Sequence, residues 1–128
     1  MAADQGARGA RGLQADAGGR NAEALACAAL ERDGWRVLGR RIRTEAGEVD
    51  AVAEKDGLLA FVEVKSRPTL SGAAEALTLR QQRRLLAAAE ILLGANPQWG
   101  RAGVRFDVVV VDGRGTVRRI ADAFRRDA

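Results

Sequence analysis

The chain has 128 residues, of which 47% are hydrophobic and 30% charged, and these values predict a single domain with a core of modest size. Its net charge of +4 and isoelectric point near 10.5 favour a polyanionic partner. Because the chain has no histidine and one cysteine, the composition excludes a zinc-finger pattern, a Ser-His-Asp triad, a Cys-His pair and an intrachain disulfide. Any catalysis must therefore use carboxylates, Lys, Arg, Ser or Thr, most plausibly with a metal.

The N-terminal part of the chain lacks an apolar run. Residues 1–17 are rich in Ala, Gly, Gln and Arg, which predicts a disordered basic tail before one domain over residues 18–128. Neither a signal peptide nor a membrane span is evident, so we expect a cytoplasmic protein without a membrane partner. Asn21 is the expected N-cap of a first helix, and Gly34 is the expected stop signal at its end. Its apolar stripe consists of Ala22, Leu25, Ala26, Ala29 and Leu30.

A first strand is expected at Trp35–Thr44, with Val37 and Ile42 facing the core. The same segment carries three arginines, Arg40, Arg41 and Arg43. Clustered arginines usually form a solvated surface. If an acidic site lies beside this strand, they become candidate phosphate contacts.

Residues 47–65 predict a β-hairpin. Two apolar-rich runs, Val49–Ala53 and Leu58–Val64, flank the dipeptide Asp56-Gly57. This dipeptide favours a two-residue type I′ turn, because both central positions of that turn need positive φ. In the resulting register, the expected core face carries Val49, Ala51, Leu58, Ala60, Val62 and Val64.

The other face of this hairpin carries charge at the end far from the turn. There the register sets Asp50 opposite Glu63 and Glu48 opposite Lys65. Neighbouring carboxylates suit a hard divalent cation such as Mg²⁺ or Mn²⁺, and a nearby lysine can reach a water or phosphate on that cation. Metal-assisted hydrolysis of a phosphodiester requires such a set. Ordinary cross-strand ion pairs of Lys65 with Glu48 and Asp50 are the alternative that geometry leaves open.

Asp50, Glu63 and Lys65 resemble the PD-(D/E)XK signature of restriction-endonuclease-like nucleases. Residues 47–50, 61–65, 105–109 and 121–124 resemble, more narrowly, the YraN-like family of small bacterial proteins, described as related to archaeal Holliday-junction resolvases. The resemblance extends from about Gly18 to Phe124. It implies Mg²⁺ or Mn²⁺ as cofactor, Asp50 and Glu63 as metal ligands, Lys65 as a catalytic residue and DNA as partner.

The resemblance also implies catalytic roles for two residues that have structural explanations. Glu23 is explained as a first-turn acid that favours the helix dipole, whereas the resemblance implies that it helps to hold metal or water. Gln81 is explained as the N3 residue of a capping box that begins at Thr78. The family commonly has a lysine at this position, which implies a place for Gln81 near the site. Further candidate nucleic-acid contacts, which are otherwise solvated surface, are Arg67, Arg80, Arg83 and Arg84.

The remaining segments complete the expected fold. A helix opened by Thr78 and ended by Gly94 is followed by a loop with an exposed Trp99, a buried strand at Val104–Val111 and a short strand at Thr116–Ile120. Asp107 is expected to be a strand-end or hydrogen-bonded acid. The order α-β-β-β-α-β-β predicts an α/β, restriction-endonuclease-like core with a mixed sheet flanked by helices.

The leading functional hypothesis is a Mg²⁺-dependent endonuclease that acts on duplex or branched DNA. A catalytically silent nucleic-acid-binding or scaffolding protein is the first alternative, and a small-molecule or RNA-directed hydrolase is the second. The few aromatic residues argue against a single-strand stacking platform. The two-fold symmetry of DNA junctions would suit a homodimer.

Overall fold

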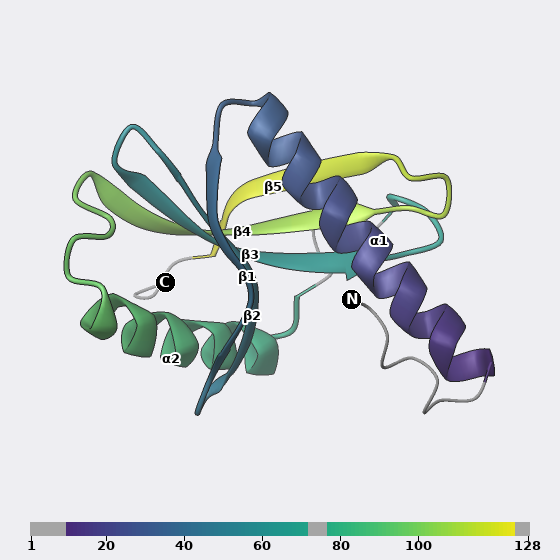
Figure 1. Cartoon of the computed structure of the whole chain (residues 1–128), viewed down its shortest axis with the longest axis horizontal. Coiled ribbons are helices and arrows are strands. Elements are labelled where there is room, and N and C mark those ends of the chain that lie inside the picture. The colour runs from purple at the N-terminus through teal and green to yellow at the C-terminus, as the bar shows by residue number, and fades with distance from the viewer. Residues whose placement is uncertain (1–9, 72–76, 125–128) are drawn as a thin grey trace.

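A five-stranded sheet with one helix packed on each face forms the molecule (Figure 1). The computed structural model describes residues 10–71 and 77–124, with side chains from residue 21 onward. The elements are α1 (Ala10–Arg32), β1 (Arg36–Thr44), β2 (Gly47–Lys55), β3 (Leu58–Ser66), α2 (Leu79–Ala95), β4 (Gly103–Val111) and β5 (Val117–Phe124). This order and the α/β class confirm the sequence prediction and are consistent with a restriction-endonuclease-like core.

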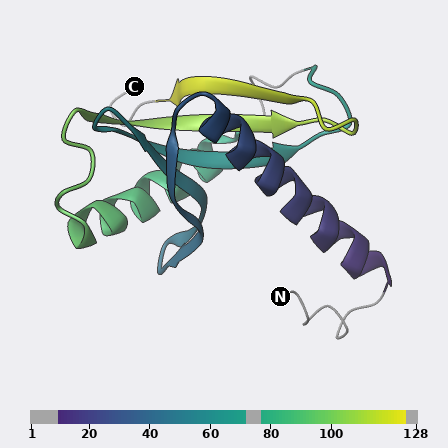
Figure 2. The same cartoon turned by 45° about the horizontal axis from the view of Figure 1, so that its top comes forward.

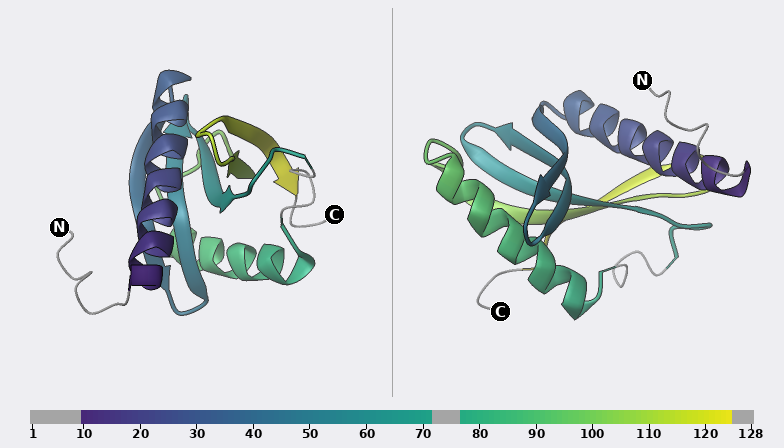
Figure 3. Two further views of the ribbon diagram at one scale, coloured as in Figure 1. Left: turned by 90° about the vertical axis from the view of Figure 1, so that its right-hand side faces the viewer. Right: turned by 60° about the horizontal axis from the view of Figure 1, so that its bottom comes forward.

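The strands follow each other across the sheet in chain order, β1-β2-β3-β4-β5. Strands β3 and β4 are parallel, and the other neighbours are antiparallel. A parallel neighbour requires a crossover connection, and α2 provides it. The two helices consequently lie on opposite sides of β2 and β3 (Figure 3).

Helix α1 begins earlier than the sequence predicted. It starts at Ala10, so Asn21 lies inside the helix and is not its N-cap. Residues 10–17, which were assigned to the tail, continue the helix because alanine, leucine, glutamine and arginine all favour helical backbone. Residues 1–9 of the expected tail lie outside the described residues. The N-terminal turns of α1 extend beyond the sheet (Figure 2). Neither described helix has the length and apolarity needed to span a membrane.

The β2–β3 hairpin has the predicted two-residue turn. Asp56 and Gly57 have φ angles of 53° and 81°, and Lys55 pairs with Leu58. The register continues through Ala51 and Val62 as expected. The turn therefore fixes which residues of the two strands meet at the far end.

We expect Gly57→Ala to lower the free energy of unfolding by about 1–2 kcal/mol, because an L-residue is strained at positive φ. A Cβ at this position would also lie 3.2 Å from the Cβ of Ala102. Chemical denaturation measures the effect. Gly94→Ala is the matched control, since nothing lies within 4 Å of its Cβ and the residue is helical. This control should stabilise the protein by up to about 1 kcal/mol, and equal effects of both substitutions would contradict the turn assignment.

The sheet buries apolar residues on both faces. The α1-side core includes Ala22, Ala26, Leu30, Trp35, Ala51, Ala53, Ala60, Val62 and Val109. The α2-side core includes Val49, Val52, Leu59, Phe61, Leu85, Ala88, Ala89 and Phe106. The prediction of an exposed Trp99 is wrong, because its ring is half-buried against the α2-side core.

Candidate active site

The candidate site lies where β2 separates from β3. Paired residues of the two strands end at Ala51 and Val62, and the backbone N–H of Val64 donates to Oδ2 of Asp50 at 2.7 Å. In a continued antiparallel ladder, that N–H would donate to a carbonyl of β2. The Asp50 carboxylate takes the place of this carbonyl, and the strands part at this point.

This separation changes the side of the sheet on which Val49 lies. The sequence predicted that Val49 shares the face of Ala51, but Val49 packs with Val52 and Phe61 in the α2-side core. The prediction is wrong because strict alternation requires a continuous pleat, and the pairing of β2 with β3 stops beside Asp50. Asp50 and Glu63 follow the last pair, Ala51 and Val62, so the predicted pairing of Asp50 with Glu63 is not part of the ladder.

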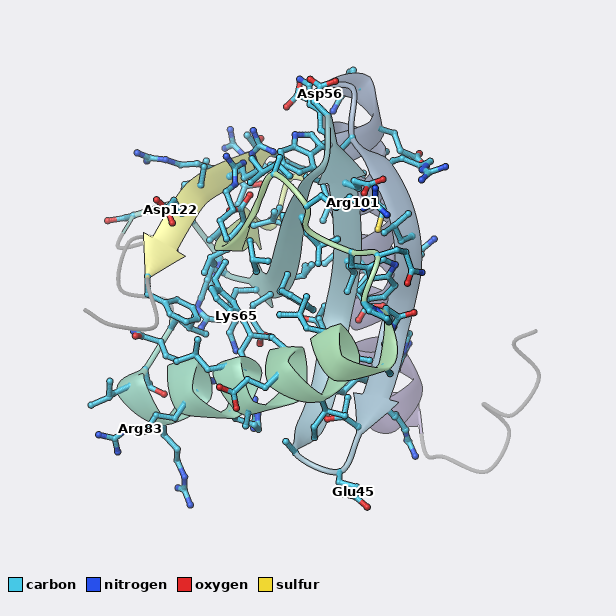
Figure 4. The ribbon with its side chains drawn as sticks, turned by 90° about the vertical axis from the view of Figure 1, so that its left-hand side faces the viewer. Glu45, Asp56, Lys65, Arg83, Arg101 and Asp122 are labelled. Carbon is cyan, nitrogen blue, oxygen red and sulfur yellow. The ribbon has the colours of Figure 1, made fainter. Side chains whose placement is uncertain are left out.

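Lys65 and Glu63 form the closest described ion pair at the site. Nζ of Lys65 lies 3.0 Å from Oε2 of Glu63, and their side chains are only 14% and 11% exposed. The expected pairing of Lys65 with Glu48 is replaced by a contact within β3, while Glu48 lies 3.9 Å from Arg43 on β1. Figure 4 shows Lys65 between the sheet and α2. An ammonium group is thus held against one acid of the candidate pair.

The charged form of Asp50 is disfavoured at this position. Burial and, after it, the neighbouring charge of Glu63 together raise the pKa of Asp50 to about 7. The hydrogen bond from Val64 opposes this shift, while Glu23 and Glu48 add smaller contributions in the raising direction. The site therefore concentrates more negative charge around Asp50 than its hydrogen bond compensates.

The chemistry of these donors fits a hard divalent cation. Asp50 and Glu63 offer carboxylate oxygens, and their repulsion is the kind that a bound cation relieves. Among the described residues, no group of three or more Asp, Glu or Cys side chains is spaced to hold a metal ion. The described arrangement is thus a pair of acids on neighbouring strands, accompanied by a lysine.

Glu23 approaches this pair from α1. Its Oε1 lies 3.8 Å from Nη1 of Arg41, and its side chain is 14% exposed. Since α1 begins at Ala10, Glu23 is not in the first turn of the helix, and the explanation through the helix dipole is wrong. Its charge raises the pKa of Asp50, so Glu23 lies within electrostatic reach of the pair.

Gln81 caps α2, as its structural explanation predicted. Its backbone N–H donates to Oγ1 of Thr78 at 3.1 Å, and its side-chain Oε1 accepts from the Thr78 N–H at 2.9 Å. Both halves of the capping box are therefore present. The catalytic role implied for Gln81 stays a prediction, and its side-chain oxygen is engaged in the cap.

The predicted nucleic-acid contacts are all exposed and lie on different elements. Arg40, Arg41 and Arg43 lie on the edge strand β1, with Arg41 at a φ of 52°. The side chain of Arg84 lies against Gly47 at the start of β2. Arg83 instead points away from the sheet (Figure 4). Arg67 and Arg80 are exposed next to the two ends of the β3–α2 connection.

The sequence alone did not predict two features of this region. The sequence carries no signal for the positive φ of Arg41 beside Asp50, because the position is occupied by neither glycine nor asparagine, which adopt this conformation most readily. A second set of charges around Trp35, Arg105 and Arg119 was also missed. Alternation of Arg105 with Asp107 in an otherwise apolar strand was the available signal.

We expect Asp50→Asn to stabilise the folded chain at pH 8 and to have little effect near pH 4. The pKa of Asp50 is higher in the folded chain than in the unfolded chain. The contribution of Asp50 to the stability of the fold is therefore present at low pH and is lost as the pH rises through about 7. The asparagine oxygen can still accept from Val64. Thermal unfolding should show a gain of at least about 1 kcal/mol at pH 8. A gain that is equal at both pH values would contradict this account.

Comparisons with known proteins give a consistent family assignment. A sequence model of the "Uncharacterised protein family UPF0102" matches residues 22–111. A UPF0102 protein of Granulibacter bethesdensis is 62% identical over 117 residues, which cover 91% of this chain and 74% of that protein. A UPF0102 protein of Acidiphilium cryptum is 47% identical over 120 residues, covering 94% and 93%. One of Azorhizobium caulinodans is 46% identical over 110 residues, covering 86% and 84%.

Proposed function

Since the chain belongs to the UPF0102 family, which is the YraN-like family that its motifs resemble, we propose that the site at Asp50 and Glu63 is that of a metal-dependent endonuclease acting on DNA. The observation that carries the proposal is that Asp50 and Glu63 lie just beyond the last β2–β3 pair, close enough for Glu63 to raise the pKa of Asp50, with Lys65 held 3.0 Å from Glu63. Two acids can hold a divalent cation, and a lysine beside them can orient a water molecule or neutralise a phosphate, so this set is able to support metal-assisted phosphodiester hydrolysis.

Each side chain has a separate role in this proposal. Asp50 and Glu63 would hold Mg²⁺ or Mn²⁺, and Glu23 would assist them from α1. When bound, the cation would supply positive charge to the phosphate and lower the pKa of a water molecule. The ammonium group of Lys65 is held beside Glu63, next to the proposed cation site. From there Lys65 would orient the attacking water or neutralise the phosphate.

Exposed arginines supply the proposed contacts to the DNA backbone. Arg40, Arg41 and Arg43 follow β1, which pairs with β2 through the site region. Arg84 lies against the start of β2 from α2. Phosphate contacts of this kind position a duplex without reading its sequence, which agrees with the basic net charge.

The test compares cleavage of linear duplex, single-stranded and four-way-junction DNA in Mg²⁺, in Mn²⁺ and in EDTA. We expect metal-dependent cleavage of duplex or branched DNA, with EDTA abolishing it. Thermal unfolding provides a second readout, because a cation held by the two acids should raise the melting temperature of the wild type and not that of Asp50→Asn. Metal-independent binding without cleavage of any substrate would favour the catalytically silent alternative.

A further inference from the structure

A cluster of basic side chains surrounds a cavity beside the turn of the β2–β3 hairpin. The cavity has a volume of about 470 Å³, and its lining is Trp35, Lys55, Asp56, Leu58, Ala102, Arg105 and Arg119. Lys55 is five residues from Asp50 along β2, which corresponds to about 17 Å at the rise of a strand. The cavity is therefore separate from the candidate active site.

At this cavity, one buried carboxylate lies beside two guanidinium groups. Asp107 is fully buried; its Oδ1 accepts from Nε of Arg105 and from the backbone N–H of Asp122, and its Oδ2 accepts from Nη2 of Arg105. Nη1 of Arg119 lies 3.9 Å from Oδ2 of Asp107, which is too far for a hydrogen bond. Arg105 thus forms the hydrogen bonds to the Asp107 carboxylate, whereas Arg119 is attracted to it only electrostatically, over a longer distance.

Arg119 consequently has an unpaired donor. Its Nη1 is buried and has no hydrogen-bond partner among the described residues. The guanidinium carbons of Arg105 and Arg119 lie 4.8 Å and 5.4 Å from the centroid of the Trp35 ring, so two cations share one aromatic side chain. The ring stabilises each cation, but it does not remove the repulsion between them.

Lys55 adds a third positive charge on the same side of the cavity. Its Nζ donates to the backbone carbonyl oxygen of Asp33 at 2.7 Å, a partner without a formal charge. Asp56 lines the cavity as well, but its side chain is exposed at the turn. Three cationic side chains therefore line the cavity, and the fully buried Asp107 lies 3.1 Å from Arg105 and 3.9 Å from Arg119.

We propose that this cavity is an anion site that binds a phosphate group through Arg119, Arg105 and Lys55. Guanidinium and ammonium groups are the usual protein ligands of phosphate, and an anion here would reduce the repulsion that Asp107 leaves between Arg105 and Arg119. The phosphate comes either free or from a nucleic-acid terminus. The proposal is independent of the hydrolysis proposed above, because it uses no residue of that site.

The first experiment measures thermal unfolding of the full chain with inorganic phosphate up to about 20 mM, at an ionic strength held constant with sodium chloride. We expect phosphate to raise the melting temperature of the wild type and not that of Arg119→Gln. Lys55→Gln, which changes an exposed residue, should require about ten-fold more phosphate for the same rise. Arg118→Gln is the matched control, since Arg118 is exposed on the same strand and does not line the cavity.

The control should respond to phosphate as the wild type does. If Arg119→Gln does not fold, Lys55→Gln carries the test. The absence of a phosphate effect on the wild type would overturn the proposal. An equal effect on the wild type, Arg119→Gln and Lys55→Gln would overturn it too.

A second experiment uses Trp35 as a local reporter and distinguishes the sources of phosphate. The chain has two tryptophans, so Trp99→Phe leaves Trp35 as the single indole fluorophore. We expect inorganic phosphate to change its emission. Tighter binding of an oligonucleotide with a 5′-phosphate than of its unphosphorylated copy would support the site and assign it to nucleic-acid ends. No emission change with either phosphate source would overturn the proposal.

Discussion

Asp50→Asn and Glu63→Gln, each made alone, are expected to lower metal-dependent DNA cleavage by at least about 100-fold. Both substitutions keep the size of the side chain and remove the charge that the proposed cation needs. Asp50→Asn also keeps an acceptor for the Val64 N–H, so the separation of β2 from β3 should persist. Initial rates at saturating Mg²⁺, with circular dichroism as a check of folding, measure the effect.

The double variant tests whether the two acids act as one unit. If Asp50 and Glu63 hold the same cation, the losses will not add, because the first substitution already removes the site. Glu54→Gln is the matched control on β2, where Glu54 pairs with Arg36 at 3.1 Å. This control should retain cleavage. Cleavage that survives both site substitutions would show that the activity resides elsewhere or in a contaminant.

Asp107→Ala is expected to lower the free energy of unfolding by about 3–5 kcal/mol. The side chain is fully buried and accepts hydrogen bonds from Arg105 and from the Asp122 backbone, so its removal leaves a half-buried guanidinium and an amide without their acceptor. Such a loss is a large part of the stability of a single domain. Urea denaturation monitored by tryptophan fluorescence gives the value.

Asp33→Ala is the control for this prediction, because Asp33 is exposed at the end of α1. We expect a change within about 0.5 kcal/mol for it. A comparable loss in both variants would show that Asp107 has no special structural role. The hydrogen bonds of Asp107 would then contribute no more to stability than the exposed side chain of Asp33 does.

Local sequence signals were sufficient for much of the fold. Asp56-Gly57 specified the hairpin turn and hence the register from Lys55 and Leu58 to Ala51 and Val62, because a tight turn leaves one register. Thr78 and Gln81 specified the start of α2, because both partners of a capping box lie within one turn. The hydrogen-bonded character of Asp107 was also anticipated, because a charge in a buried strand needs partners.

The failures arise where tertiary contacts outweigh local pattern. The face of Val49 depends on β2 leaving β3, and this separation depends on a hydrogen bond to a side chain distant in sequence. The partner of Lys65 depends on the conformation of a flexible side chain, which register alone does not set. The last strand extends to Phe124, beyond the predicted Ile120, because the Asp122 backbone bonds to Asp107 on β4.

The arginines of β1 have a consequence for self-association. Strand β1 forms one border of the sheet, and its exposed side chains include Arg36, Arg40, Arg41 and Arg43. A second copy that approached this border to extend the sheet would bring like charges together, which natural proteins use to prevent strand-to-strand aggregation. Charge repulsion therefore disfavours pairing of two copies through β1, whereas the same arginines attract a negatively charged polymer.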